Sequence, residues 1–179
     1  MNKQIKIFGL NIYRQYKKMS KTHEYQTLVE WTGNEGSGTT DYRSYNRNHR
    51  IICEGKAAIS GSSDPAFRGD ASRHNPEELL VASIASCHML WFLHLCSQAG
   101  VVVTAYEDGA TGFMKETADG GGHFTCVTLR PRVTIREKSM EAKVNDLHHQ
   151  AGKLCFIANS CNFPVRHEAI TLIEEHPYT

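Results

Sequence analysis

One stretch of the sequence, NPEELLVASIASCHMLWFL at residues 75–93, decides the fold because it predicts a long buried helix. Asn75 is a favourable N-cap residue, and Pro76 suits the first helical position. The two glutamates that follow favour the positive end of the helix, and Glu78 is placed to complete a capping box. We expect the helix to end near Gly100. Because it is apolar all round, we expect it to be buried on every face.

A second helix is predicted over residues 139–154, where Met140, Val144, Leu147 and Leu154 form an apolar stripe at near-helical spacing. The rest of the chain contains strand-like stretches separated by turns rich in glycine. We expect strands at residues 25–31, 39–45, 49–53, 101–114, 124–136 and 165–173. This order of elements predicts an α+β domain whose helices are covered by antiparallel sheet.

The composition is that of an ordinary globular protein, with 40% of the 179 residues hydrophobic and 22% charged. The formal net charge of +1 gives no electrostatic reason to expect nucleic-acid binding. Residues 1–18 carry only basic charges, which predicts an N-terminal extension outside a single domain at residues 19–179. A signal peptide is the less favoured alternative, because Lys6 interrupts the short apolar segment there.

The most apolar run, residues 79–96, has the length of a membrane span but contains His88, His94 and two serines. A helix in the centre of a soluble domain fits this run better. We therefore expect a cytoplasmic protein with no membrane partner.

Cysteines are the first candidates for chemistry, and none of the six lies in a C-x-x-C motif. Zinc-ribbon and thioredoxin motifs are therefore absent from the sequence. Cys87 falls inside the apolar helix, where a free cysteine commonly packs as a small hydrophobic residue. Cys155 lies near the end of the second helix, six residues before Cys161. The residues alone leave both a packing role and a chemical role open for these thiols.

Histidines are the second candidates, and the chain has ten of them. His88 and His94 do not share a helix face, and the adjacent His148 and His149 point apart. We expect no metal site and no cofactor. His88 follows Cys87 in sequence but faces away from it on a helix, which makes it a poor candidate for a base.

Three segments together resemble the signature of the OsmC/Ohr family, the osmotically inducible and organic hydroperoxide resistance proteins. They are NPEELL at residues 75–80, ASCH at residues 85–88 and AGKLCFIANS at residues 151–160. The segments VEWTG at residues 29–33 and GSSDP at residues 61–65 agree with the same family. The similarity extends over residues 25–173.

The resemblance implies an OsmC-like α+β fold, an intertwined homodimer with two central helices wrapped by sheets, and active sites at the subunit interface. It also implies a thiol peroxidase in which Cys87 is the peroxidatic cysteine and Cys155 the resolving one. Glu77 would orient an arginine. Arg68 is preferred for that arginine because Phe67 and Gly69 flank it as in the family, and Arg73 is the alternative. The family often has proline after the second cysteine, where this chain has Phe156.

These residue types suit the implied chemistry. Only a thiolate attacks a peroxide, and a guanidinium favours the thiolate and the departing alkoxide. A second thiol converts the resulting sulfenic acid to a disulfide. Met89, Trp91, Phe92 and Phe156 would form an apolar wall suited to an organic hydroperoxide, although such residues are more often plain core. The expected electron donor is a dithiol or a lipoyl-type protein. The alternatives are a non-catalytic protein that binds a hydrophobic ligand and a thiol redox sensor.

Overall fold

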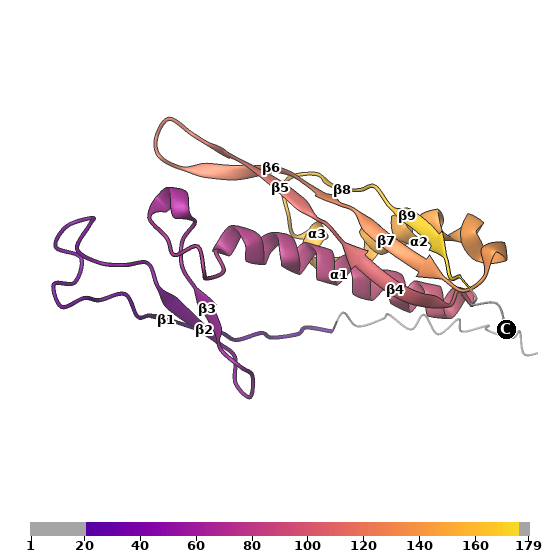
Figure 1. The fold of residues 1–179 in the computed structure, drawn as a ribbon, viewed down its shortest axis with the longest axis horizontal. Coiled ribbons are helices and arrows are strands. Elements are labelled where there is room, and N and C mark those ends of the chain that lie inside the picture. Colours follow the sequence, from indigo (N-terminus) through magenta and orange to yellow (C-terminus); the bar gives the residue numbers. More distant parts are fainter. Residues whose placement is uncertain (1–20, 176–179) are drawn as a thin grey trace, which may run out of the picture.

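The computed structural model describes residues 21–175, so the predicted basic extension at residues 1–18 lies outside the described residues. The chain forms an α+β fold (Figure 1). The strands are β1 (Leu28–Trp31), β2 (His49–Ile52), β3 (Ile59–Gly61), β4 (Val103–Asp108), β5 (Thr111–Glu116), β6 (Gly122–Leu129), β7 (Pro131–Ile135), β8 (Val165–His167) and β9 (Ile170–Ile173). The helices are α1 (Pro76–Ala99), α2 (Glu141–Leu154) and α3 (Phe156–Asn159), with single 3₁₀ turns at Pro65–Phe67 and Lys138–Met140.

Helix α1 begins and ends where the sequence predicts. The Asn75 side chain accepts a hydrogen bond of 2.7 Å from the Glu78 backbone N–H. The Glu78 carboxylate accepts one of 3.2 Å from the Asn75 N–H, which completes the capping box. At the other end, Gly100 adopts the left-handed conformation, with φ of 72°, that a helix C-terminus favours in glycine.

The strands form three sheets of three. The first has the order β1-β2-β3 and forms an arm that projects beyond the start of α1 (Figure 1). The other two have the orders β4-β7-β9 and β5-β6-β8 and follow one another along α1. Strands β8 and β9 run parallel to β6 and β7, so the expectation of purely antiparallel sheet is wrong. The helical connection through α2 and α3 is what allows this parallel return.

Three strands predicted as continuous are each broken in two, and the breaks face one another. Arg130 stands between β6 and β7, and its backbone N–H donates to the Asp108 carboxylate at 2.7 Å. Its guanidinium donates to Glu168 at 3.1 Å and to Thr111 at 2.9 Å. Arg130 therefore links all three breaks. The breaks lie at the boundary between the β4-β7-β9 sheet and the β5-β6-β8 sheet.

The predicted strand at residues 39–45 is wrong, because this segment forms turns. The Asp41 carboxylate accepts from the Arg43 N–H at 2.8 Å, and the Ser44 hydroxyl accepts from the Asp41 N–H at 3.1 Å. Such local side-chain bonds compete with the pairing that a strand needs.

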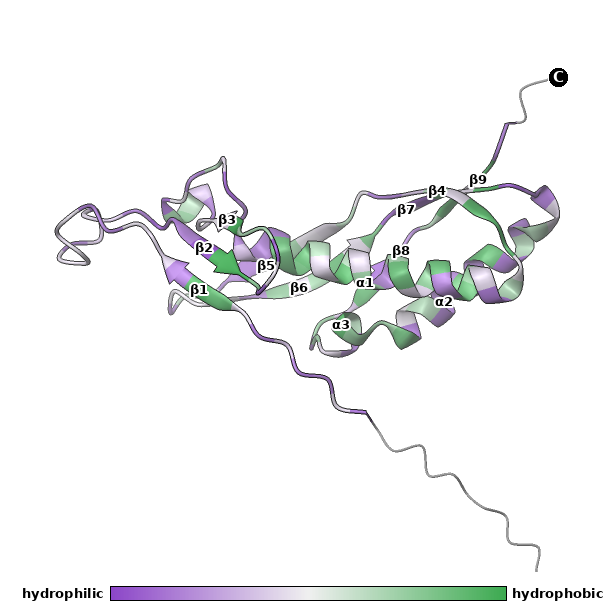
Figure 2. Ribbon diagram, turned by 90° about the horizontal axis from the view of Figure 1, so that it is seen from below, coloured by the Kyte–Doolittle hydropathy of each residue, from purple (hydrophilic) through white to green (hydrophobic). Residues whose placement is uncertain are grey.

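Only one stripe of α1 is buried in the single chain, so the expectation of burial on every face is wrong at this level. Its fully buried residues recur every fourth position, at Ile84, His88, Phe92 and Cys96. The sheets and α2 cover this stripe, while Leu90 on the opposite side is 63% exposed. Figure 2 shows hydrophobic residues along α1 and α3 on the face seen from below. By length and composition alone α1 could cross a membrane, a test that the core helix of a soluble protein also passes.

Candidate functional site

Cys87 lies on the uncovered side of α1, half-buried, in an open cleft of about 970 Å³. The walls of this cleft are mainly apolar. Leu90 and Trp91 come from the same helix, and Phe156 and Ile157 come from α3. The rings of Trp91 and Phe156 meet edge to face, with centroids 5.6 Å apart. The remaining lining residues are Tyr25, Lys56, Ser83, Ser86 and His94.

Cys155 lies next to Cys87, although 68 residues separate them in sequence. It is completely buried at the corner between α2 and α3. Its Sγ caps α3 by accepting from the Ala158 N–H at 3.4 Å. Burial first, and the neighbouring Cys87 thiol in addition, raise the pKa of the Cys155 thiol to about 11. The structure thus brings the two predicted thiols together, and both are free.

Glu77 lies at the start of α1 and lines a different cavity, of about 580 Å³, between α1 and the start of β5. Its Oε2 atom is buried and has no hydrogen-bond partner within residues 21–175. The guanidinium carbon of Arg68 instead lies 5.9 Å from the centroid of the Tyr42 ring. Arg73 pairs with Asp70 at 3.2 Å. Neither arginine is bonded to Glu77 in the described chain, so the predicted carboxylate–arginine pair stays a prediction.

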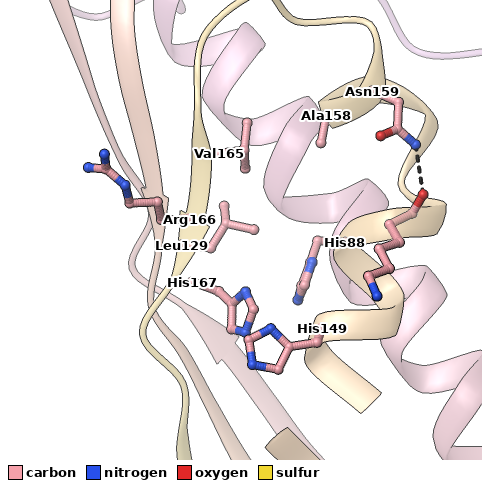
Figure 3. Close-up of a pocket in the computed structure, with 10 residues that line it drawn as sticks. His88, Leu129, His149, Ala158, Asn159, Val165, Arg166 and His167 are labelled. Atoms are coloured by element: carbon pink, nitrogen blue, oxygen red, sulfur yellow. Dashed lines mark hydrogen bonds between the residues drawn. The ribbon is translucent and has the colours of Figure 1, made fainter. Parts of the chain in front are cut away.

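Four histidines gather on the other side of α1, although they come from three elements. His88 Nε2 and His148 Nδ1 are 3.0 Å apart in a buried hydrogen bond. The ring of His167 on β8 lies 5.7 Å from each of these rings and 4.7 Å from that of His149. His88, His149 and His167 line a cavity of about 350 Å³, which we call the histidine pocket (Figure 3).

Burial decides the charge of the inner histidines. Burial first, and neighbouring imidazoles second, lower the pKa of His88 to about 4 and that of His148 to about 3. The pKa of His167 is lowered for the same reasons. The Nε2 atom of His148 is buried without a hydrogen-bond partner among the described residues. Within residues 21–175, no three His, Cys, Asp or Glu side chains are placed to hold a metal ion.

Two basic side chains of the Cys87 cleft, Lys56 and His94, were not predicted to lie beside this cysteine. His94 could have been found, because it follows Cys87 by seven residues and therefore lies on the same face of α1. Lys56 comes from the turn between β2 and β3, and no local pattern connects that turn to α1. The contact of His88 with His148 was likewise missed, because it joins positions 60 residues apart.

The fold and the paired cysteines define a class of α+β protein with two thiols side by side at the edge of a central helix. The sequence profile of the OsmC-like protein family matches residues 69–169, more than half of the chain. The chain belongs to the OsmC-like family. No curated protein matches it.

Solved structures with this fold agree with that assignment. An OsmC-like protein of unknown function from Vibrio cholerae is 32% identical, with a TM-score of 0.76 over 83% of this chain and 100% of that one. An organic hydroperoxide resistance protein from Legionella pneumophila is 18% identical, with a TM-score of 0.60 over 84% and 99% of the chains. One from Bacillus subtilis is 19% identical, with a TM-score of 0.57 over 82% and 98%. At these lower identities, the last two show the fold alone.

Proposed function

We propose that the protein is a thiol-dependent peroxidase that reduces organic hydroperoxides to alcohols in oxidative-stress defence. The observation that carries this proposal is the position of Cys87 beside Cys155 in a cleft with apolar walls. Some proteins of the same fold are named organic hydroperoxide resistance proteins, which supports the same reaction. The walls formed by Leu90, Trp91 and Phe156 suit the hydrocarbon part of such a substrate better than they suit hydrogen peroxide.

The proposed reaction has three balanced steps. The Cys87 thiolate attacks one oxygen of the hydroperoxide, the O–O bond breaks, and the departing alkoxide takes up a proton to become an alcohol. The Cys155 thiol then condenses with the Cys87 sulfenic acid: the S–S bond forms, the S–OH bond of Cys87 breaks, and the thiol proton joins the departing hydroxyl group as water. A dithiol or lipoyl-type donor supplies two electrons and two protons, which restores both thiols.

Burial of Cys155 assigns an order to these steps. A thiol with a pKa of about 11 is almost entirely protonated at neutral pH and is a weak nucleophile. Cys87 is the thiol that faces the open cleft, so it meets the peroxide first. Cys155 acts second, because the sulfenic acid forms next to it.

We also propose that the protein works as an intertwined homodimer in the cytoplasm. The exposed apolar side chains of the arm, Leu28 and Val29, are 60% and 61% exposed, and Phe156 beside Cys87 is 69% exposed. A second chain would cover such surfaces. It would also be able to bring its Arg68 to the unpartnered Glu77.

The test is consumption of cumene hydroperoxide by the reduced protein with excess dithiothreitol, compared with consumption of hydrogen peroxide. Cys87→Ser should abolish turnover, and the organic peroxide should be preferred. Cys126→Ser is the matched control, because this half-buried thiol lies on β6 and outside the cleft. Turnover by Cys87→Ser at the parent rate would refute the proposal.

A non-catalytic protein that binds a hydrophobic ligand is the second candidate. The observation that favours it is that neither Arg68 nor Arg73 bonds to Glu77 in the described chain. In that case no peroxide would be consumed, and Cys87→Ser would leave ligand binding unchanged. A redox sensor is distinguished by a Cys87–Cys155 disulfide that forms once, without turnover.

A further inference from the structure

The histidine pocket takes no part in the proposed peroxidase reaction, because it lies on the other side of α1 from the Cys87 cleft. It opens between α1, α2 and β8. Its volume of about 350 Å³ is enough for a small organic molecule.

The polar wall of the histidine pocket consists of imidazoles at increasing depth. His149 is exposed, His167 is half-buried, and His88 is 2% exposed at the bottom. Figure 3 shows the rings of His149 and His167 together at one side of the pocket, with His88 facing them from α1. His88 is already bonded to His148, whereas neutral His149 and His167 each offer one N–H donor, so this wall can donate two hydrogen bonds to one ligand.

The fixed charges around the histidine pocket are positive. Its lining includes Lys153 and Arg166 and, among the described residues, no carboxylate. Figure 3 shows Arg166 directed away from His167 across β8, so we assign the role of the cation to Lys153. A cavity with a cation and N–H donors favours a negatively charged group. The side chain of Val165 lies on the apolar wall, where it would face a hydrocarbon part.

A metal ion fits these residues less well. His88 and His148 already bond to each other at 3.0 Å, which uses one nitrogen of each ring. No trio of ligating side chains in the described chain is placed around one point. We propose that the histidine pocket binds a small organic acid, with its carboxylate against His149, His167 and Lys153 and its hydrocarbon part against Val165.

Binding of an acid here should become stronger as the pH falls. The rings of His88 from α1 and of His148 and His149 from α2 face His167, Lys153 from α2 lines the same pocket, and the described lining residues include no carboxylate that could stabilise its cation. A bound carboxylate would supply the missing negative charge and favour uptake of a proton. For one proton, affinity rises by up to about tenfold for each unit that the pH falls between the pKa of His167 in the complex and its lower pKa in the free protein, and it levels off below the latter.

The test is calorimetric titration of the full chain with benzoate, with benzamide as the uncharged analogue of the same shape. We expect benzoate to bind more tightly at pH 6 than at pH 8, and benzamide to bind at least about tenfold more weakly than benzoate at pH 6. Lys153→Gln should weaken benzoate binding by about tenfold. Lys143→Gln is the matched control on α2, because Lys143 is exposed and does not line the pocket.

Two readouts locate the ligand. The imidazole proton signals of His149 and His167 should shift on addition of benzoate, and His167→Phe should abolish saturable binding. Equal affinity for benzoate and benzamide, or equal effects of Lys153→Gln and Lys143→Gln, would overturn the proposal. So would tight binding of Zn²⁺ that His167→Phe abolishes, because it would make the pocket a metal site.

Discussion

Acid should destabilise the protein through the buried pair His88 and His148 before most carboxylates are protonated. Burial lowers the pKa of His88 from 6.5 to about 4, and this side chain is only 2% exposed. His88 therefore binds a proton below pH 6.5 in the unfolded chain, but only below about pH 4 in the folded chain. Stability present above pH 6.5 is lost as the pH falls through this window.

The size of the effect follows from the pKa difference. A lowering from 6.5 to about 4 corresponds to about 3 kcal/mol when fully expressed, and about 2 kcal/mol of it is lost between pH 7 and pH 5. The lowered pKa of His148 acts in the same direction. A loss of this size is a large part of the stability of an ordinary domain, about 5–15 kcal/mol.

The assay is urea unfolding at pH 7 and pH 5 at one protein concentration, so that association contributes equally. His88→Gln should reduce the difference between the two pH values by about 2 kcal/mol, because the titrating group is gone while a hydrogen-bonding side chain remains. His94→Gln, on the exposed side of the same helix, is the matched control. Equal stability of the parent at both pH values would refute the reasoning, as would equal effects of the two variants.

Two further predictions concern the core and the thiols. Phe92→Ala should cost about 3–5 kcal/mol in urea unfolding, because the ring is fully buried and stacks on His148 at 3.8 Å. A cost below about 1 kcal/mol would contradict the described packing of α1 on α2. Cys155 should react with iodoacetamide at pH 8 far more slowly than Cys87, because it is buried and its pKa is about 11. Peptide mapping by mass spectrometry measures both rates, and equal rates would contradict the described burial.

Local sequence signals predicted helix α1. The breaks in the long strands could not be predicted in this way, because they involve contacts between residues far apart in the sequence. Asn75 and Glu78 bond to each other within one helical turn, so the start of α1 can be found in the sequence. At the breaks in the long strands, Arg130 bonds to Asp108, 22 residues away, and to Glu168, 38 residues away. A pattern of alternating residues contains no information about such a bond.

Some residues of the candidate site could be predicted from the sequence, and others could be found only in the structure. The sequence resemblance indicated Cys87 and Cys155, and the structure places them together. Lys56 reaches the Cys87 cleft only because the arm lies near α1, which no periodicity predicts. The pairing of Glu77 with Arg68 stays a prediction, because within residues 21–175 the Glu77 carboxylate has a buried oxygen without a partner and Arg68 lies against Tyr42.

The arm has a consequence for assembly. Strands β1, β2 and β3 form one sheet, and a single parallel bridge joins Gly61 at the end of β3 to His74 just before α1. There the Ser62 N–H donates to the His74 carbonyl at 2.9 Å. In an intertwined dimer, each arm would keep all its internal pairing while it packs on the other chain. Each chain would then hold the arm of the other, so the two subunits would dissociate slowly. Mixed dimers of two variants would form mainly during folding, and not by exchange of subunits between folded dimers.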